Sequence, residues 1–595
     1  MADSNRDGWY RLPKVSLTSK DLSRRMRRVE TTTMRHAHKF IVKRWSNVRE
    51  VRRHIITWII TISVLIAATG MQLIWFQRSY TTTAPATDGT YAEGVLGPVS
   101  TLNPIFANTS AEQSAGDLMF SHLLNYDTTG HLTNDLATNI AIDSSHTVYT
   151  VTIRPDAKWD DGVNLTAQDV AYTVNLLQNP ATHSTISGWS DIQVKALNST
   201  TVQFTLPAPY AAFKYALTFP ILPQHILGSV SPENIQENNF SNAPIGSGPF
   251  EFSFTQSVDA SSGTEIVHMT RNNNYYGGTA KIQNFQLNVY PSTDAIVHAL
   301  AVSEVNAAAD LSITDLSNVN LNRYTTISSP IDSGVYALLN TTSATLSDKT
   351  VRQALQVGTD TASIRNDLSI PQPALDLPFT NGQLTGDVPS APVFNRAQAE
   401  QLLDSDGWVL QNGVRTKNGK TLSLSIVTIK NTVFERVLEI LSGQWRALGI
   451  QVNTQVVDPS DPTQDVFQNI LKPRNYDVLL YQIDIGADPD VYAYWDSTQV
   501  NALNYSNYSN AISDDALASA RSRLEPDLRN AKYITFAKEW LQDVPAIGIY
   551  QPTAEYVYSN GVQTYNQANT LVSAVDRYAD VLQWSVGSHT VYKTP

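Results

Sequence analysis

The longest uncharged apolar run of the chain lies near its N-terminus, from Ile55 to Gln77. A helix of about 22 residues, rising about 1.5 Å per residue, extends over roughly 33 Å, which matches the hydrocarbon core of a bilayer. Trp58, Trp75 and Phe76 lie near the ends of this run, where interfacial aromatic side chains are favoured. The pattern therefore predicts one transmembrane helix. A helix buried in a soluble core is a poorer explanation, because so long an uncharged stretch is rare there.

Beyond residue 90 the pattern changes to short alternating segments separated by helix-like ones. Alternation of apolar and polar residues predicts strands at 147–153, 201–206, 286–290, 422–426 and 477–481. Helical spacing predicts helices at 397–403, 434–448 and 514–524, and Thr166 with Asp169 predicts the start of another. Strands interleaved with helices indicate mixed α/β lobes, and about 500 residues exceed what one core usually serves.

Charge orients the predicted membrane helix. Residues 1–54 carry 15 Lys and Arg against 5 Asp and Glu, whereas Arg78 is nearly alone on the other side of the apolar run. An excess of Lys and Arg marks the cytoplasmic flank, so we expect the N-terminus inside the cell and the main domain outside it. An uncleaved signal-anchor is favoured over a signal peptide cleaved near Ala84-Pro85-Ala86, because the preceding region and the apolar run are both too long.

The basic arm, residues 1–54, has a membrane-based explanation. Ile41, Trp45 and Val48 recur at helical spacing among Lys and Arg, which predicts a helix on the inner leaflet that binds anionic lipid. Nucleic-acid binding is not expected, since topology already accounts for the positive charge. The net charge of the whole chain is −12, so the part after the arm is strongly acidic and suits neutral or cationic ligands better than polyanions.

The chain contains no cysteine. It therefore forms no disulfide and cannot be attached to a membrane through a lipid-modified cysteine. No metalloprotease, serine-hydrolase or phosphate-loop motif occurs, and the eleven His residues are scattered. We expect neither an enzyme nor a metal site, and no cofactor.

Several short motifs recur in an order that resembles one family. The stretch Tyr149-Thr-Val-Thr-Ile-Arg-Pro-Asp-Ala-Lys-Trp-Asp-Asp-Gly162 is the first of them, and the others lie at 165–172, 219–226, 244–250, 274–277, 351–355, 402–408, 445–450, 486–490 and 504–507. Together they resemble the extracytoplasmic solute-binding proteins of peptide-type ABC importers over about residues 90–570. Some motifs also have local explanations, such as a tight turn at Asp161-Gly162 and a left-handed helix end at Gly407 before Trp408.

The resemblance implies an α/β, two-lobed periplasmic-binding-protein-like fold with a discontinuous first lobe. We expect a basic arm at 1–54, the membrane helix at 55–77 and a linker at 78–90. The first lobe is expected at 91–332 with a subdomain at about 140–240, the second lobe at 333–545, and a return to the first lobe at 546–595. A hinge would let the lobes close around a ligand.

The segment 481–495 is the leading candidate for ligand contact, because it follows a buried-looking strand and carries carboxylates where α/β clefts open. In peptide-binding members of the family, a carboxylate in this stretch pairs with the α-ammonium of the peptide. Asp488 and Asp484 are both candidates for that role, and Asp490 is expected to cap a helix. The aromatic candidates are Tyr492, Trp495 and Trp189, and the rim candidates are Asn103, Asn125 and Tyr126.

The resemblance implies a receptor that captures peptides outside the cell for the permease of an ABC importer. The apolar run predicts that this receptor is anchored in the membrane, and we expect it to be a monomer. Two alternatives remain open. An oligosaccharide receptor of the same fold is compatible with the abundance of Tyr, Trp and Asn. A ligand sensor that signals through the basic arm would explain why residues 1–54 are long for an anchor.

Overall fold

The computed structural model describes residue 34 and residues 48–259, 263–317, 319, 322–368, 372–458, 464–563 and 570–592. The expected inner-leaflet helix around Ile41 and Trp45 lies outside these residues. The chain divides into two compact units. One comprises residues 1–84 with 590–595, and the other comprises residues 85–589.

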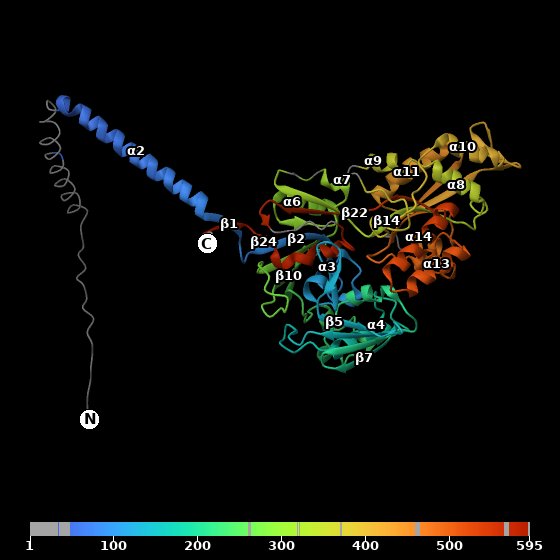
Figure 1. Cartoon of the computed structure of the whole chain (residues 1–595), viewed down its shortest axis with the longest axis horizontal. Coiled ribbons are helices and arrows are strands. Elements are labelled where there is room, and N and C mark those ends of the chain that lie inside the picture. Colours follow the sequence, from blue (N-terminus) through green and yellow to red (C-terminus); the bar gives the residue numbers. More distant parts are fainter. Residues whose placement is uncertain are drawn as a thin grey trace. The chain divides into compact units, whose positions relative to one another are not determined.

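The first unit contains α2 (Val48–Tyr80), a helix of 33 residues (Figure 1). Its segment Val51–Phe76 is long and apolar enough to cross a membrane, with a mean hydropathy of 2.0. The expected linker at 78–90 differs from the structure, because the helix continues to Tyr80 and β1 (Thr81–Pro85) pairs with β25 (Ser588–Tyr592). Three consecutive β-branched threonines in β1 favour a strand over a free linker.

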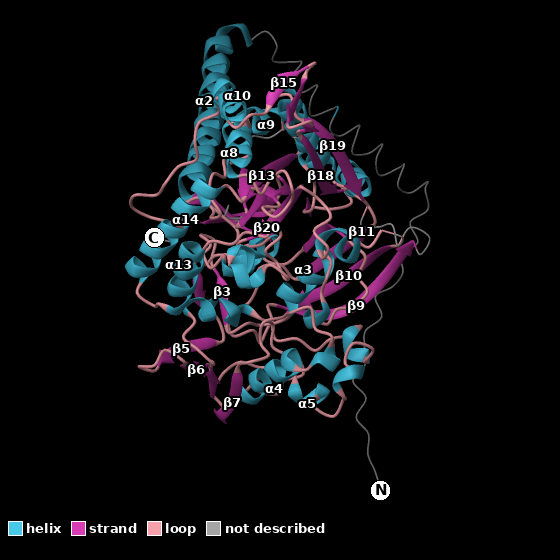
Figure 2. Ribbon diagram, turned by 90° about the vertical axis from the view of Figure 1, so that its right-hand side faces the viewer, coloured by secondary structure: helices cyan, strands magenta, loops and turns pink. Residues whose placement is uncertain are grey.

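In the second unit, lobe I is built on a seven-stranded sheet (Figure 1). Its order is β13-β22-β12-β2-β11-β10-β9, and β2 pairs in parallel with β11 and β12. The strands are β2 (Thr90–Leu96), β9 (Phe250–Asp259), β10 (Thr264–Arg271), β11 (Asn284–Tyr290), β12 (Ala307–Ala308), β13 (Tyr324–Pro330) and β22 (Thr553–Ser559). Strands β9 and β10 form a long antiparallel hairpin (Figure 2).

Short elements complete lobe I. They are η2 (Pro104–Phe106), α3 (Ser110–Met119), β3 (Leu124–Tyr126), β4 (Leu132–Asn134), α6 (Thr293–Val302), α7 (Ile313–Leu316), β23 (Val562–Gln563), η9 (Ala574–Gln583) and β24 (Ser585–Val586). A buried ion pair ties the C-terminal segment to the sheet: the Arg577 guanidinium donates to the Glu93 carboxylate at 2.6 and 3.0 Å. The hydroxyls of Tyr556 and Tyr578 donate to the same carboxylate, so its charge is fully compensated.

The predicted subdomain of lobe I is a four-stranded antiparallel sheet of order β5-β6-β8-β7 with a helix against it. Its elements are β5 (Ala137–Ile142), β6 (Val148–Ile153), α4 (Ala167–Gln178), η3 (Pro180–Thr182), β7 (Gln193–Asn198), β8 (Thr201–Thr205), η4 (Ala211–Thr218), α5 (Gln224–Leu227), η5 (Pro232–Asn234) and η6 (Asn239–Ser241). The predicted capping box is present, since the Asp169 carboxylate accepts the Thr166 amide at 2.8 Å. A side chain at Gly246 would overlap the Met119 carbonyl, which explains that glycine.

Lobe II has a mixed five-stranded sheet of order β19-β18-β20-β14-β21. Its strands are β14 (Ser333–Leu339), β18 (Ser423–Ile429), β19 (Gln451–Val457), β20 (Val478–Asp484) and β21 (Ala546–Tyr550), with a small sheet of β15 (Val409–Gln411), β16 (Val414–Lys417) and β17 (Lys420–Thr421). Its helices are α8 (Lys349–Val357), α9 (Thr361–Asp367), α10 (Arg396–Ser405), α11 (Thr432–Ala447), η7 (Phe467–Leu471), α12 (Tyr492–Trp495), η8 (Ser497–Gln499), α13 (Ala511–Ser522) and α14 (Pro526–Asp543).

The chain crosses between the lobes twice, and the two crossings lie side by side. The first is at Ile331–Asp332, between β13 and β14. The second lies between β21 and β22, at Gln551–Pro552. Ile331 donates its amide to the Pro552 carbonyl at 2.9 Å. The expected return at 546 is thus a few residues early, because the apolar strand β21 pairs with β14 of lobe II.

Candidate functional site

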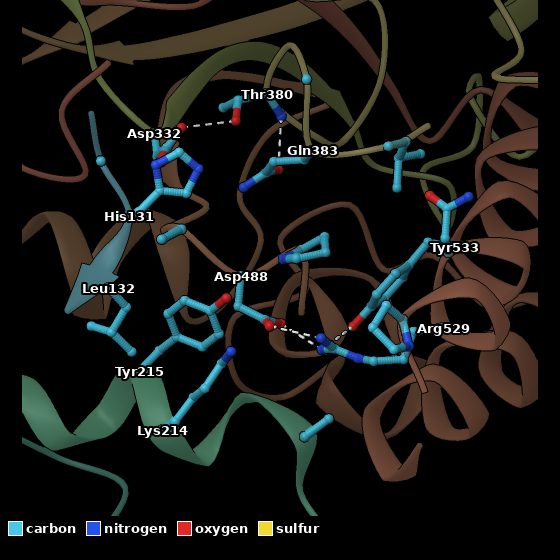
Figure 3. Close-up of a pocket in the computed structure, with 18 of the residues that line it drawn as sticks. His131, Leu132, Lys214, Tyr215, Asp332, Thr380, Gln383, Asp488, Arg529 and Tyr533 are labelled. Atoms are coloured by element: carbon cyan, nitrogen blue, oxygen red, sulfur yellow. Dashed lines mark hydrogen bonds and ion pairs between the residues drawn. The ribbon is translucent and has the colours of Figure 1, made fainter. Parts of the chain in front are cut away.

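A cavity of about 850 Å³ lies between the lobes, and we call it the interlobe cavity. Figure 3 shows its centre, where Lys214 and Tyr215 of η4 face Asp488, Arg529 and Tyr533 of lobe II. Its lining combines apolar, aromatic and charged side chains, as in sites that enclose small ligands. Because both lobes contribute, opening at the hinge would release whatever the cavity holds.

Asp488 and Arg529 form a buried ion pair on the lobe II wall of the interlobe cavity (Figure 3). Both nitrogens of the Arg529 fork donate to the Asp488 carboxylate, at 2.6 and 2.8 Å. Arg529 and Tyr533 lie four residues apart on α14, so they share one face, and Arg529 donates to the Tyr533 hydroxyl at 3.1 Å. Burial would lower the pKa of Arg529, but the hydrogen bonds and charge of Asp488 outweigh it and raise that pKa. The pair is therefore a fixed, neutral part of the wall.

Asp332 lines the interlobe cavity at the first hinge crossing. Its backbone carbonyl accepts the amides of Ile485 and Gly486, at 2.9 and 2.8 Å, which joins the crossing to the end of β20. Its carboxylate accepts the Thr380 hydroxyl at 2.9 Å (Figure 3). Burial raises the pKa of Asp332 to about 6, although the Thr380 hydrogen bond opposes the rise. Asp332 therefore offers a carboxylate that no cation neutralises among the described residues.

Lys214 is the cation on the opposite wall of the interlobe cavity (Figure 3). Its ammonium lies 5.0 Å from the centre of the Tyr215 ring. Within the part of the chain that the structure describes, no carboxylate forms an ion pair with it. The cavity thus presents an acid at the hinge and a base on the subdomain side.

Arg521 of α13 joins the two lobes beside the interlobe cavity. Its guanidinium lies 4.7 Å from the centre of the Tyr210 ring of lobe I and 4.6 Å from that of Tyr492 of lobe II. It also forms an ion pair of 3.2 Å with Asp490. Tyr492 and Asp490 belong to the same lobe as Arg521, so only the contact with Tyr210 crosses between the lobes, and it stabilises their closed arrangement.

A second cavity, of about 380 Å³, lies within lobe I, and we call it the lobe I cavity. Asn125 and Tyr126 of β3 line it together with His122, Asp117 and Asp576. Burial raises the pKa of the Tyr126 hydroxyl, and the carboxylates of Asp576, Asp332 and Asp488 add to the effect. Since the last two line the interlobe cavity, Tyr126 lies between the cavities.

The predicted site residues fall into separate groups. Asp488 lines the interlobe cavity, and Asn125 and Tyr126 line the lobe I cavity. Asp484 lies at the end of β20, where it accepts the Ser333 hydroxyl at 2.8 Å. Tyr492 lies against Arg521. Their ligand contacts stay predictions.

Three other candidate residues have buried side chains that line neither cavity, and their ligand contacts also stay predictions. Trp495 is 1 % exposed and packs edge-on against Trp540 in the lobe II core. Trp189 is buried among phenylalanines of the subdomain, with its ring centre 4.8 Å from that of Phe219. Asn103 is fully buried and accepts the Ile105 amide at the start of η2. Large aromatic rings gain most from complete burial, which explains the first two.

The sequence interpretation missed six charged residues of the two cavities: Asp117, Lys214, Asp332, Asp527, Arg529 and Asp576. Of these, only Arg529 carried a local signal, through its spacing to Tyr533 on one helix face. Asp332 coincided with the expected lobe boundary, but nothing in the sequence directed its side chain to the cavity. Across the described residues, no group of three or more His, Asp or Glu side chains could hold a metal ion.

Two lobes, a double-stranded hinge and an enclosed cavity define a solute-binding protein of the hinged class. The chain belongs to the bacterial extracellular solute-binding proteins of family 5, because the model of the family's middle region matches residues 131–504. Members of this family bind solutes and are not enzymes. The predicted fold and family are therefore confirmed.

Relatives with different ligands are similar to this chain. The oligopeptide-binding protein AppA of Bacillus subtilis is 27% identical over 504 residues, which cover 81% of this chain and 89% of that protein. The nickel-binding periplasmic protein of Escherichia coli is 26% identical over 368 residues, which cover 60% of this chain and 68% of that one.

Solved structures share the fold. The structure of Bacillus subtilis AppA in complex with a nonapeptide has a TM-score of 0.67 and 24% identity, covering 85% of this chain and all of that one. NikZ from Campylobacter jejuni in complex with Ni(L-His) has a TM-score of 0.69 and 24% identity, covering 83% of this chain and 99% of that one.

Proposed function

We propose that this protein captures peptides outside the cell and delivers them to the permease of an ABC importer. The observation that carries the proposal is that, within the described residues, the interlobe cavity is lined by an unpaired carboxyl group, that of Asp332, at the hinge and by an unpaired ammonium, that of Lys214, on the opposite wall. A peptide with free termini carries one ammonium and one carboxylate, so its charges complement these two side chains. The relative AppA, an oligopeptide-binding protein covered over 89% of its length, supports the same ligand class.

Asp332 is the best placed carboxylate for the peptide ammonium. Asp488 already accepts two hydrogen bonds from Arg529 and one from the Asp490 amide, which leaves little capacity for a ligand. Asp332 accepts one side-chain hydrogen bond, from Thr380, and the structure brings it to the hinge. A charge-assisted bond to an enclosed ammonium would contribute about 1.5–3 kcal/mol. Asp484 and Asp488 remain predicted contacts of lower rank.

Binding closes the lobes in this proposal. A ligand that touches Asp332 and the lobe II wall together with Lys214 gains contacts only when the lobes are closed. The Arg521 contact with Tyr210 then holds the closed form that the permease recognises. Energy for transport would come from the ATPase subunits of the importer.

The proposal places α2 across the membrane as a signal-anchor with the basic arm in the cytoplasm, next to anionic lipid. The absence of cysteine makes this testable without background labelling. A single Asn418→Cys variant should react with a membrane-impermeant maleimide on intact cells, and a Ser4→Cys variant should react only after lysis. Labelling of the Ser4→Cys variant on intact cells would show instead that the N-terminus lies outside the cell.

The ligand class is tested with the full-length protein in detergent. Mixed peptides of two to nine residues should raise its unfolding temperature, and native mass spectrometry should show peptides that copurify. A rise with oligosaccharides but none with peptides would replace the proposal by the oligosaccharide receptor. To test for a sensor, residues 2–40 are deleted: unchanged uptake with unchanged cytoplasmic partners would exclude signalling through the arm.

A further inference from the structure

The lobe I cavity adjoins the interlobe cavity along three segments of chain. In β3, Leu124 lines the interlobe cavity, whereas Asn125 and Tyr126 line the lobe I cavity. Helix η4 contributes Lys214 and Tyr215 to the first cavity and Thr218 to the second. The segment 570–576 does the same, with Thr570 on one side and Ser573 and Asp576 on the other. A ligand in the interlobe cavity therefore lies next to the lobe I cavity.

The charge of the lobe I cavity is one-sided. Asp117 and Asp576 both line it, and its described lining residues include no Lys or Arg. The nearest cation is Arg577, which is buried and already paired with Glu93 at 2.6 Å. Asp576 accepts the Ser573 amide at 2.5 Å as part of a capping box, whereas no hydrogen bond to the Asp117 carboxylate is found among the described residues. Two carboxyl groups therefore face this space without a cationic partner among its described lining residues.

His122 is an independent sign that the lobe I cavity receives a polar group. Its side chain lines the cavity and is only 8 % exposed. The described part of the chain provides no hydrogen-bond partner for its imidazole. Burial lowers the pKa of His122 to about 4, so the ring is neutral at physiological pH and adds no positive charge. The neutral ring can therefore accept a hydrogen bond from a polar group that enters the cavity.

The position of Asp117 on its helix also indicates that this residue serves a ligand. Asp117 lies in the last turn of α3, where the helix dipole is negative and a carboxylate is disfavoured. Nothing in the folding of α3 requires an acid there, because the N-terminal capping box of Thr109 and Glu112 already fixes the helix start. A residue that conflicts with its local environment is often retained for function.

We propose that the lobe I cavity is a specificity pocket for the basic side chain of a Lys or Arg residue in the bound peptide. Asp117 and Asp576 would pair with the cation, and the imidazole of His122 would accept a hydrogen bond from it. A volume of about 380 Å³ leaves room for a long side chain beside the main cavity. This inference rests on the proposed function and names its ligand class more narrowly.

The protonation states of Asp117 and Asp576 should change when a cationic side chain binds in the lobe I cavity. Burial and then the charge of Asp576 raise the pKa of Asp117 to about 8, Asp135 adds to the rise, and Arg577 opposes it. Burial also raises the pKa of Asp576 to about 6. A bound cation favours the ionised carboxylates, so it lowers both pKa values and drives protons off. Basic peptides should therefore release protons on binding and bind more tightly as pH rises from 6 to 8.

The test is isothermal titration of the full-length protein with alanine pentapeptides that carry one Lys, Arg, norleucine or acetyl-lysine at each position in turn. In at least one position, Lys and Arg should bind about tenfold or more tightly than norleucine and acetyl-lysine. Titration in buffers of different ionisation enthalpy should show proton release for Lys and Arg alone. Asp117→Asn should abolish both effects, whereas Asp191→Asn, at an exposed carboxylate, should change neither.

The other possible results of this titration each contradict one part of the proposal. Equal affinity for Lys and norleucine at every position, or a Lys preference that survives Asp117→Asn, overturns the basic-side-chain pocket and leaves peptide binding intact. Failure of every pentapeptide to bind overturns the proposed function. Asp576→Asn serves as a second variant, and a circular dichroism spectrum like that of the parent shows that the variant is folded.

Discussion

The two cavities differ in whether a buried carboxyl group has a cationic partner. In the interlobe cavity, Asp488 is 7 % exposed and is held by both arms of Arg529. In the lobe I cavity, Asp117 has no cationic partner among the described residues, and burial raises its pKa to about 8. Removing charges from water costs free energy in both places, but only the first carboxylate is compensated within the protein. A carboxylate that already has a cationic partner has a structural role, whereas one without a partner is available to a ligand. The presence of the acid in a cavity does not by itself distinguish these roles.

The cavities also differ in what shapes them. The interlobe cavity requires both lobes and changes with the hinge at Asp332 and Gln551. The lobe I cavity lies within one lobe, so it keeps its form when the lobes open. A preformed pocket costs less entropy on binding than one that must assemble, which suits the recognition of a single side chain.

The largest expected effect comes from removing the cationic partner of Asp488. Arg529→Met leaves Asp488 buried without its partner, which should lower the free energy of unfolding by about 3–5 kcal/mol. Chemical denaturation of lobe II, followed by tryptophan fluorescence, measures the loss. Arg436→Met is the matched control, because its ion pair with Asp367 is exposed and should contribute little. If both variants unfold alike, the buried pair has no special structural role.

The second effect concerns the uncompensated acid and has a defined sign. Between pH 4 and pH 8 the folded protein binds more protons at Asp117 than the unfolded chain, because the pKa is raised in the fold. This carboxyl therefore makes stability fall as pH rises through that range. Asp117→Asn should raise the free energy of unfolding at pH 8 but not at pH 4, by an amount on the order of 2 kcal/mol. An equal change at both pH values would contradict the raised pKa.

A third experiment removes the cation that faces Asp332. Lys214→Met should weaken binding of peptides with a free carboxylate by about 1.5–3 kcal/mol and leave peptides with an amidated C-terminus unaffected. Titration calorimetry with matched acid and amide peptides makes the measurement. The preference for Lys over norleucine should persist in this variant, since Lys214 does not line the lobe I cavity. Loss of that preference would show that the cavities do not act separately.

The smallest effect is expected from the contact that joins the lobes. Tyr210→Leu removes the cation–π contact with Arg521 that crosses between the lobes, worth about 0.5–2 kcal/mol, and keeps the ion pair of Arg521 with Asp490, so peptide affinity should fall severalfold. Small-angle scattering should show a larger radius of gyration without ligand, because the closed form is less populated. Unchanged affinity and radius would show that this contact does not hold the lobes together.

Local sequence signals predicted the elements around these cavities well. The run that contains β20 was recognised by its apolar residues, and the box of Thr166 and Asp169 does begin α4. Gly162 and Gly407 adopt positive φ values of 87° and 90°, as their turn and helix-end assignments required. Such features depend on neighbours a few residues away, so a single sequence contains enough information to place them.

Side-chain destinations were harder to predict. Trp189 and Trp495 were expected at a ligand and are buried in cores, because a loop-like sequence context does not reveal what packs against an indole ring. Asp488 reached a cavity, but its pairing with Arg529 joins residues 41 positions apart. Asp117 and Asp576 are separated by most of the domain and meet only through the return of the chain to lobe I.

The sequence by itself determined the apolar helix, the order of strands and helices, and membership in a family of two-lobed binding proteins. These follow from periodicity, capping and motifs that act over short distances. The tertiary structure decided which acids are paired and which are not, and it brought Asp332, Lys214 and Asp117 to cavity walls. Charge compensation in a cavity depends on contacts between distant segments, and those exist only once the sheets have assembled.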